Sequence, residues 1–371
     1  MCGVVGFIDS SNHIDESIMN SMLSQLNSRG PDDQGFWLDN ELGVAIGHTR
    51  LSIIDTTHAG KQPMISKCGR YILSYNGEIY NHLELRNQIE TKLSDFYWRG
   101  SSDTETLLES IACWGLEATL SKINGMFAFA LWDRSLKQLI LVRDRIGEKP
   151  IYYGQSSGTF FFASDSRALR HHPNWKGEID RNALSLYMQY STVPAPHCIY
   201  KGIKKLEPAH YVVIGKQGQT ISEPIRYWGL EDLEPKKTST MNFPESKLVD
   251  SLDNLLQDAV GLRMMADVPL GAFLSGGYDS TMIVAQMQAQ SSRPVKTYSI
   301  GSTDDNFNEA HFAASVAKHL GTDHTELYVT MDDAIKVISK LPHIYDEPFA
   351  DSSQIPTYLV SQLARNDVTV A

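Results

Sequence analysis

The sequence predicts an α+β domain of antiparallel sheets layered with helices, followed by an α/β domain built on a parallel sheet. Short apolar runs separated by Gly, Asn and Asp fill the first half, with a few amphipathic helices between them. After about residue 215 the chain becomes polar, and from residue 246 helices alternate with short apolar strands. Such alternation indicates a doubly wound parallel sheet, whereas many short strands with few helices indicate an α+β domain.

The elements of the first half define a domain at residues 2–215. Short apolar runs predict strands at 2–8, 71–75, 126–132, 139–143 and 159–164. Apolar residues that recur three or four positions apart predict helices at 18–27, 82–89 and 104–114.

The second half begins after a polar passage that predicts a linker at 216–245 and contains Pro235. Beyond it, helices are expected at 248–264, 280–288 and 308–320, and strands at 271–274, 295–300 and 324–329. They define a second domain at 246–371. The chain ends on an apolar run at 368–371 that is typical of a starting buried strand, so we expect this sheet to be incomplete and the chain to be a fragment.

Composition excludes several classes of protein. The 371 residues carry 33 Lys and Arg against 44 Asp and Glu, a formal net charge of -11. Nucleic acid is not an expected partner, because an acidic chain without a basic stripe is repelled by phosphate. Four widely spaced cysteines disfavour a disulfide scaffold and a structural zinc site. With no signal peptide and no long apolar run, we expect a cytoplasmic protein that makes no membrane contact.

Cys2 is the first candidate catalytic residue. Removal of Met1 would leave the Cys2 thiol and a free α-amino group on one residue. An α-amino group has a pKa near 7.7 to 8.0 and can take a proton from the thiol at neutral pH, as in N-terminal-nucleophile hydrolases. The alternative interpretation of Cys2 alone is a small buried residue in the first strand.

Seven sequence blocks around this cysteine resemble a known family. MCGVVGF (1–7), RGPD (29–32), HTRLSIID (48–55), YNGEIYN (75–81) and SDTE (102–105) resemble the glutamine-hydrolysing domain of class II amidotransferases. GMFAFA (125–130) and RDRIGEKPIYY (143–153) resemble the asparagine synthetase branch of that family. The resemblance implies an N-terminal-nucleophile sandwich for the first domain.

The resemblance also implies roles for particular residues. It assigns catalysis to Cys2, Asn76 and Gly77, and glutamine binding to Arg50, Leu51, Ile53, Asn76, Gly77, Glu78 and Asp103. These side chains suit glutamine: an arginine can fork onto the α-carboxylate, and either acidic residue can pair with the α-ammonium. Asn76 and the Gly77 N–H can donate to the oxygen that becomes negative when the thiol attacks.

Simpler interpretations of three blocks stay open. Asn76-Gly77 is by itself a favourable turn, and so is Arg29-Gly30-Pro31. Residues 143–145 are expected to be structural or interdomain rather than catalytic.

A glycine-rich loop in the second half predicts an anion site. Residues 275–280 (SGGYDS) lie between an apolar strand and a helix, where backbone N–H groups and the helix N-terminus favour an anion. The loop resembles the pyrophosphate loop of ATP pyrophosphatases. That resemblance implies ATP binding by Leu274, Ser275, Gly276, Gly277, Asp279, Ser280 and Ile300, with Asp279 on Mg²⁺. The alternative is a tight turn capped by serine.

The resemblance as a whole implies a glutamine-dependent asparagine synthetase, truncated within its ATP-pyrophosphatase-type domain. Ammonia from glutamine would pass through an apolar interdomain tunnel to a carboxylate adenylated by ATP, with aspartate as the default acceptor. Products would be asparagine, glutamate, AMP and pyrophosphate. A uronic acid in surface-polysaccharide synthesis is an alternative acceptor, and a glutaminase-only hydrolase is an alternative of another class. A second loop, S-G-x-G-x-D-E, follows in relatives, so the 371-residue chain is expected to fail at adenylation. The sequence leaves the oligomeric state open, a homodimer included.

Overall fold

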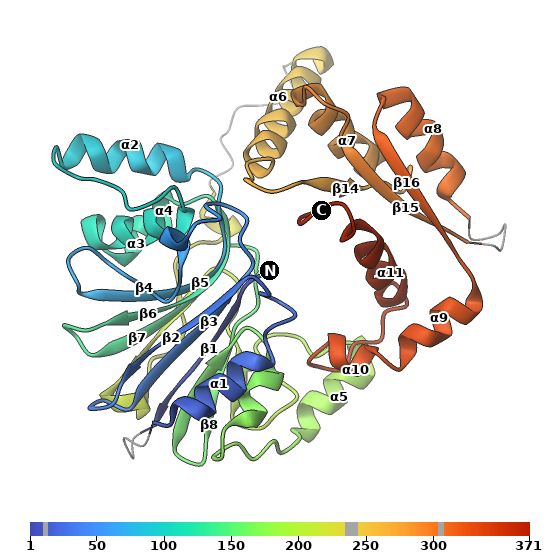
Figure 1. Cartoon of the computed structure of the whole chain (residues 1–371). Helices are drawn as coiled ribbons and strands as arrows, with labels where there is room; N and C mark the ends of the chain where they lie inside the picture. Colours follow the sequence, from blue (N-terminus) through green and yellow to red (C-terminus); the bar gives the residue numbers. More distant parts are fainter. Residues whose placement is uncertain (10–13, 234–243, 303–307) are drawn as a thin grey trace. The chain divides into compact units, whose positions relative to one another are not determined.

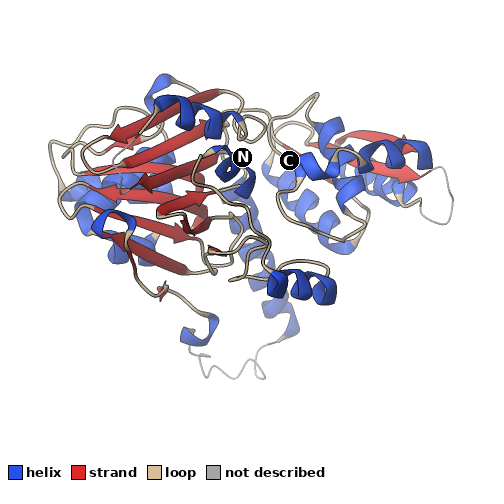
Figure 2. Cartoon of the chain, turned by 90° about the horizontal axis from the view of Figure 1, so that it is seen from below, coloured by secondary structure: helices blue, strands red, loops and turns tan. Residues whose placement is uncertain are grey.

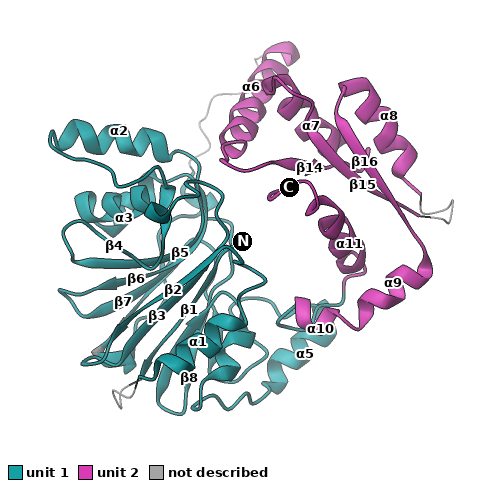
Figure 3. Ribbon diagram, viewed as in Figure 1, with its two compact units in different colours: residues 1–234, 345–350 teal, residues 235–344, 351–371 magenta. Residues whose placement is uncertain are grey.

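The computed structural model describes residues 1–9, 14–233, 244–302 and 308–371. The chain divides into two compact units. The first contains Met1–Glu234 and Tyr345–Ala350, and the second contains Pro235–Ile344 and Asp351–Ala371 (Figure 3). Of the expected linker at 216–245, residues 234–243 lie outside the described part of the chain.

The first unit is built on two antiparallel sheets, whose strands are coloured red in Figure 2. The six-stranded sheet has the order β10 (Ile203–Lys205), β8 (Tyr152–Ser156), β9 (Thr159–Ala163), β1 (Gly3–Asp9), β3 (Val44–Arg50) and β2 (Asp33–Asp39). The seven-stranded sheet has the order β12 (Thr220–Ile221), β11 (His210–Gly215), β7 (Gln138–Arg143), β6 (Gly125–Asp133), β5 (Tyr71–Ile79) and β4 (Met64–Ile65), with β13 (Ile225–Arg226) beside β11. Both β12 and β13 pair with β11, so the sheet continues past residue 215.

The two sheets pack face to face and helices cover their outer faces (Figure 1). Between the sheets, Val4 and Ile46 pack with Ile72 and Leu141. The first sheet is covered by α1 (Glu16–Ser24), η2 (Ser166–His171) and α5 (Arg181–Tyr190), and the second by α2 (His82–Lys92), α3 (Asp103–Trp114) and α4 (Leu116–Lys122). The predicted α+β sandwich of antiparallel sheets and helices is therefore confirmed.

β1 is the strand that carries Cys2 into the sandwich. All seven of its residues are buried, and it pairs with β3 on one side and β9 on the other. A β-carbon on Gly6 would lie 2.2 Å from the Phe162 ring, so only glycine allows this close approach. The sequence missed β3 because His48, Thr49 and Arg50 end its apolar run, although all of β3 is buried, and it missed β2 because Asp, Gln and Gly leave that strand only three consecutive apolar residues.

The second unit contains the parallel sheet that the alternation predicted. β14 (Gly271–Phe273), β15 (Lys296–Ser302) and β16 (Asp323–Val329) are neighbours in that order and run parallel. The helices are α6 (Glu245–Arg263), α7 (Tyr278–Gln290), α8 (Ala310–Leu320), α9 (Met331–Ile338), α10 (Leu341–Ile344) and α11 (Gln354–Ala364). At residues 368–371, where a strand was expected, Val370 forms a parallel bridge with Leu270.

The passage at residues 345–364 is divided between the two units. Tyr345–Ala350 belongs to the first unit, and Gln354–Ala364 forms α11. Pro356 is tolerated because it lies in the first turn of that helix, where backbone N–H groups have no intrahelical acceptor. Among the described residues, no helix has the length and apolar character needed to cross a membrane.

Candidate active site

Cys2 lies directly before β1 and is held by two loops of the first unit. The Leu51 N–H donates to the Cys2 sulfur at 3.4 Å, and the thiol points back to the Leu51 carbonyl at 3.6 Å. On the other side, Arg29 Nε donates to the Cys2 carbonyl at 3.1 Å. The loop after β3, which also contains Ile53, therefore fixes the sulfur, while Arg29 fixes the backbone of the same residue.

The electrostatics at Cys2 favour a neutral thiol beside a neutral amine. Burial raises the pKa of the Cys2 thiol, so the thiol keeps its proton at neutral pH. Burial also lowers the pKa of the N-terminal amine to about 6, although the Met1 side chain is exposed. Removal of Met1 would leave an α-amino group on Cys2 itself, and the unprotonated form of that group can accept the thiol proton when the sulfur attacks.

Asn76 points into the space between the two sheets. Side chains alternate along β5, so Ser74, Asn76 and Glu78 share one face. Ser74 donates from this face to the Gly47 carbonyl of β3, and Glu78 acts electrostatically on the N-terminal amine. Asn76 lies between them on the Cys2 side of the strand. Its amide Nδ2 is buried and has no hydrogen-bond partner among the described residues.

Gly77 leaves no space for a side chain. A β-carbon there would lie 2.2 Å from the Met126 carbonyl of β6. The structure therefore explains Asn76-Gly77 as part of a paired strand, with Gly77 opposite Phe127, and the interpretation as a simple turn is wrong.

Asp103 lies at the start of α3, with Ser102 as the helix N-cap. Its carboxylate accepts from the Tyr75 hydroxyl at 2.8 Å and from the Ile79 N–H at 2.9 Å. Burial raises the pKa of Asp103, and its negative charge in turn contributes to the raised pKa of Cys2. Asp103 and Cys2 are thus within electrostatic reach of each other.

Arg50, at the end of β3, is held by the loop that follows it. Its guanidinium donates to the Thr57 carbonyl at 2.9 Å and also to the Asp55 carbonyl. Two of the five N–H donors of the guanidinium are used in this way. The Asp55 carboxylate accepts from the Ser101 N–H at 2.7 Å, so the Arg50 loop is joined to the loop that leads into Asp103.

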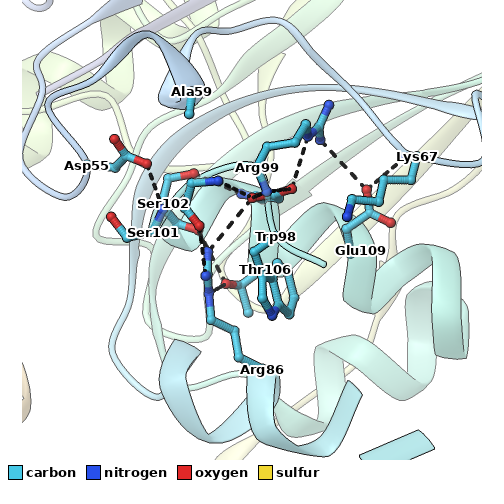
Figure 4. Close-up of polar contacts among 12 residues, drawn as sticks. Asp55, Ala59, Lys67, Arg86, Trp98, Arg99, Ser101, Ser102, Thr106 and Glu109 are labelled. Atoms are coloured by element: carbon cyan, nitrogen blue, oxygen red, sulfur yellow. Dashed lines mark hydrogen bonds and ion pairs between the residues drawn. The ribbon is translucent and has the colours of Figure 1, made fainter. Parts of the chain in front are cut away.

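A charged network supports this second loop, and Figure 4 shows its members. The buried Glu105 carboxylate accepts from the backbone N–H groups of Arg99 and Gly100 and from Arg99 Nε at 3.0 Å. Arg86 donates to the carbonyls of Gly100 and Ser102, both at 2.9 Å. Residues 99–102 are therefore held from both sides, which fixes the position of Asp103.

Two residues at the site were missed as functional candidates from sequence. Arg29, expected to mark a turn, binds the Cys2 carbonyl, and its Nη2 is buried without a partner among the described residues. Lys149 is buried, and its positive charge contributes to the lowered pKa of the N-terminal amine. Both belong to blocks that carried the family resemblance, but nothing in their spacing showed that they would meet Cys2.

Arg143 and Asp144 make structural contacts, in line with the expectation for residues 143–145. Arg143 donates to the carbonyls of Gly147, Lys149 and Leu206. Asp144 accepts from four backbone N–H groups, including that of Phe127 on β6. This corner therefore anchors the turn that carries Lys149.

The glycine-rich loop of the second unit joins β14 to α7. Gly276 has a positive φ of 82°, and a β-carbon there would lie 2.7 Å from Phe312 Cβ. The hydroxyls of Ser275 and Ser280 are 2.9 Å apart across the loop. Gly277 is the helix N-cap and has no side chain with which to cap α7, while the Ser275 hydroxyl accepts from the Gly277 N–H at 3.4 Å within the turn. The first turn of α7 keeps the geometry that suits an anion.

A cavity of about 300 Å³ lies beside this loop within the second unit. Leu274 and Ser275 line it from the loop, Ile300 from β15, and Pro356 from α11. Leu274 and Ile300 are the two residues expected to flank an adenine, and the structure brings them together. The cavity thus adjoins the loop at Leu274 and Ser275, at the carboxyl ends of the parallel strands, where ligands bind in such sheets.

A metal ion at this site would be bound partly by the protein and partly by a bound substrate. Within the described ranges, no group of three or more His, Cys, Asp and Glu side chains could hold a metal ion. Asp279 is exposed in the first turn of α7. One exposed carboxylate next to a phosphate-type loop fits Mg²⁺, which is commonly bound by one or two carboxylates together with substrate phosphates.

The fold and the site define a class of protein with two parts: a sandwich domain that holds Cys2 and a parallel-sheet domain with a glycine-rich loop. Comparisons with known families agree with this division. Residues 1–228 match the family described as glutamine amidotransferase domain, and residues 251–371 match the family described as asparagine synthase. The chain is 33% identical over its whole length to a Methanocaldococcus jannaschii protein provisionally named asparagine synthetase (glutamine-hydrolysing) 2. It is also 34% identical over its whole length to asparagine synthetase (glutamine-hydrolysing) 1 of Bacillus subtilis. The chain belongs to the glutamine-hydrolysing asparagine synthetase family.

The relatives are longer than this chain, which spans 73% of the M. jannaschii protein and 57% of the B. subtilis protein. Among solved structures, the chain is similar to a glutamine phosphoribosylpyrophosphate amidotransferase from B. subtilis, with a TM-score of 0.45 and 18% identity. That similarity covers 88% of this chain and 65% of the other.

Proposed function

We propose that the protein is a glutamine-dependent synthetase: it releases ammonia from glutamine at Cys2 and uses it to amidate a carboxylate activated by ATP. The observation that carries the proposal is the buried Asn76 amide, an unpartnered donor among the described residues, on the face of β5 that is turned toward the strand of Cys2. Burying a polar donor without a partner is costly, so a site that keeps one has a use for it in binding or catalysis.

Glutamine hydrolysis requires three steps. The Cys2 sulfur attacks the carboxamide carbon, and its proton passes to the α-amino group, which belongs to Cys2 once Met1 is removed. Asn76 Nδ2 and the Gly77 N–H donate to the oxygen that becomes negative. The amine returns the proton as the C–N bond breaks and ammonia leaves. Water then hydrolyses the thioester to glutamate and regenerates the thiol.

Recognition of glutamine is assigned to the charged groups around this centre. Arg50 uses two N–H groups on its own loop and has others for the α-carboxylate. Asp103 and Glu78 are both buried and acidic, and either suits the α-ammonium. Leu51 and Ile53, in the loop after β3, complete the proposed glutamine site.

In the second unit, ATP is proposed to bind in the cavity beside the glycine-rich loop. Leu274 and Ile300 contact the base, while Ser275, Gly276, Gly277 and Ser280 hold the phosphates. Mg²⁺ held by Asp279 would neutralise phosphate charge during adenylation of the acceptor. The second unit's own residues bind and orient the nucleotide.

Aspartate is the proposed acceptor, giving asparagine with glutamate, AMP and pyrophosphate. Support comes from the names of the relatives that match the whole chain. A homodimer and a cytoplasmic location belong to the same proposal. In support, the four cysteines are free in the structure, as is usual for proteins of a reducing compartment.

Separate assays for the two half-reactions test the proposal. We expect Cys2→Ala to abolish glutamate release, while Cys113→Ala, which changes another partly buried cysteine, releases glutamate as the unchanged protein does. Aspartate-dependent exchange of pyrophosphate into ATP tests the acceptor. Glutamate release that survives Cys2→Ala would disprove the nucleophile, and exchange that depends on another carboxylate would disprove aspartate.

A further inference from the structure

Six residues from late in the chain are built into the first unit. Tyr345–Ala350 follows more than 100 residues of the second unit in sequence, yet it belongs with Met1–Glu234. The Ala350 N–H donates to the Ser191 carbonyl at 2.9 Å, which ties the end of the segment to the residue after α5. We call residues 345–350 the acidic strap, because Asp346 and Glu347 make most of its polar contacts.

Asp346 is bound on both oxygens of its side chain. Oδ2 accepts from the Ser166 N–H at 2.8 Å, and Oδ1 accepts from the Tyr152 hydroxyl at 3.3 Å. The Ser166 hydroxyl also donates to the Asp346 carbonyl at 3.4 Å. Asp346 therefore holds the start of η2 through both the main chain and the side chain of Ser166.

Glu347 binds the strap to a second part of the first unit, at Ile199 and Lys205. Its Oε1 accepts from the Ile199 N–H at 2.7 Å, and its Oε2 accepts from the Tyr152 hydroxyl at 3.3 Å. Lys205 forms an ion pair with the same carboxylate, whose side chain is only 8% exposed. Tyr152 thus contacts both acidic residues, and the strap is bound by neutral donors and by one cation.

The strap reaches Cys2 through two short connections. In the first, Ser164, two residues before Ser166, binds Val4 twice: the Val4 N–H donates to the Ser164 hydroxyl at 3.1 Å, and the Ser164 N–H donates to the Val4 carbonyl at 2.8 Å. Asp346 thus supports the segment that clamps the beginning of β1, two residues from the nucleophile.

The second connection is electrostatic and passes through Arg29, which binds the Cys2 carbonyl. Burial lowers the pKa of Arg29, and the negative charges of Asp165 and Asp346 oppose that effect. The pKa of Asp346 is raised by its own burial and by the nearby charge of Asp165. The strap thereby adds negative charge where a buried guanidinium would otherwise be poorly compensated.

We propose that the acidic strap is a working part of the glutaminase centre, and that Asp346 is a positioning residue that sets the geometry of Cys2 through Ser166 and Arg29. The inference rests on glutamine hydrolysis at Cys2 as the proposed function. It means that a segment within the synthetase part of the sequence completes the glutaminase site, so glutamine turnover depends on residues beyond 228.

The test measures glutamate release by the whole 371-residue chain at varied glutamine concentration. Asp346→Asn keeps the shape of the side chain but removes its charge, and we expect kcat to fall by about tenfold to a hundredfold with a smaller change in KM, as for a nucleophile displaced by a fraction of an ångström. Asp351→Asn, a change at an exposed aspartate just outside the strap, is the matched control and should keep the kcat of the unchanged protein.

A second variant, Tyr152→Phe, tests the same role in case Asp346→Asn impairs folding. Tyr152→Phe removes the hydroxyl that both carboxylates accept and keeps the ring, so we expect kcat to fall at least about threefold with thermal unfolding nearly unchanged. In an Arg29→Lys background, Asp346→Asn should lower kcat by less than it does alone, because the two residues act through one connection.

The possible results separate this inference from the proposed function. If the unchanged protein releases no glutamate, or if Cys2→Ala still does, the proposed function fails. If the unchanged protein is active and Asp346→Asn and Tyr152→Phe both keep its kcat within about twofold, the positioning role is refuted. If the effects of Asp346→Asn and Arg29→Lys on kcat are fully additive, the connection through Arg29 is refuted.

Discussion

Replacing Asn76 by alanine tests the proposed oxyanion site most directly. The Asn76 amide Nδ2 is buried and makes no hydrogen bond to the described residues. In the resting protein it therefore contributes no bond that the substitution could break. During attack by Cys2 it would donate to the developing negative charge, so its loss should raise the energy of the transition state alone.

The magnitude follows from these two facts. Loss of one oxyanion donor lowers kcat by about 10² to 10³, or about 2.7 to 4 kcal/mol of transition-state stabilisation. A buried polar group without a partner costs about 1 to 3 kcal/mol of folding free energy, and alanine removes that cost while leaving a small cavity. These effects on stability oppose each other, so the free energy of unfolding should change by less than about 1 kcal/mol.

Steady-state glutamate release and urea unfolding would measure the two quantities. Ser74→Ala is the matched control, because Ser74 lies on the same face of β5 and donates to the Gly47 carbonyl at 3.0 Å. It should lower stability by about 1 kcal/mol and keep kcat for glutamine. A kcat for Asn76→Ala within about fivefold of the unchanged protein would refute the donor role.

Three further outcomes are expected. The kcat/KM for glutamine should fall as the pH drops below about 8, because the α-amino group of Cys2, with an ordinary pKa near 7.7 to 8.0, accepts the thiol proton only when it is unprotonated; a kcat/KM that stays constant from about pH 9 to about pH 5 would contradict this. Gly276→Ala, at a positive φ, should lower the free energy of unfolding by at least about 1 kcal/mol and weaken ATP binding measured by calorimetry. Gly277→Ala is the control and should fold normally, because its β-carbon would lie 3.4 Å from Ser275 Oγ. Glu105→Ala should cost about 3 kcal/mol in urea unfolding because it leaves the Arg86 and Arg99 charges without their shared carboxylate, and an unchanged midpoint would show that the network is dispensable.

The parts of the site predicted from sequence depend on short-range chemistry. A thiol at position 2 and the residues 275–280 between a strand and a helix indicate their chemistry within a few positions. Apolar periodicity likewise predicted α2, α3 and the alternation of the second unit, because burial of one face requires that spacing whatever the partner. The family resemblance then ordered the glutamine-binding residues along the chain, without giving their distances.

The sequence by itself thus determined the class of fold, and it was enough to propose Cys2 as the nucleophile and residues 275–280 as an anion-binding turn. Only the tertiary structure decided that Arg29 binds the Cys2 carbonyl, that Asn76 keeps a buried donor without a partner among the described residues, and that residues 345–350 close around Tyr152. Each of these three features depends on segments that lie far apart in sequence. Strand register and the packing of whole elements choose such partners, and no local pattern of residues encodes that choice.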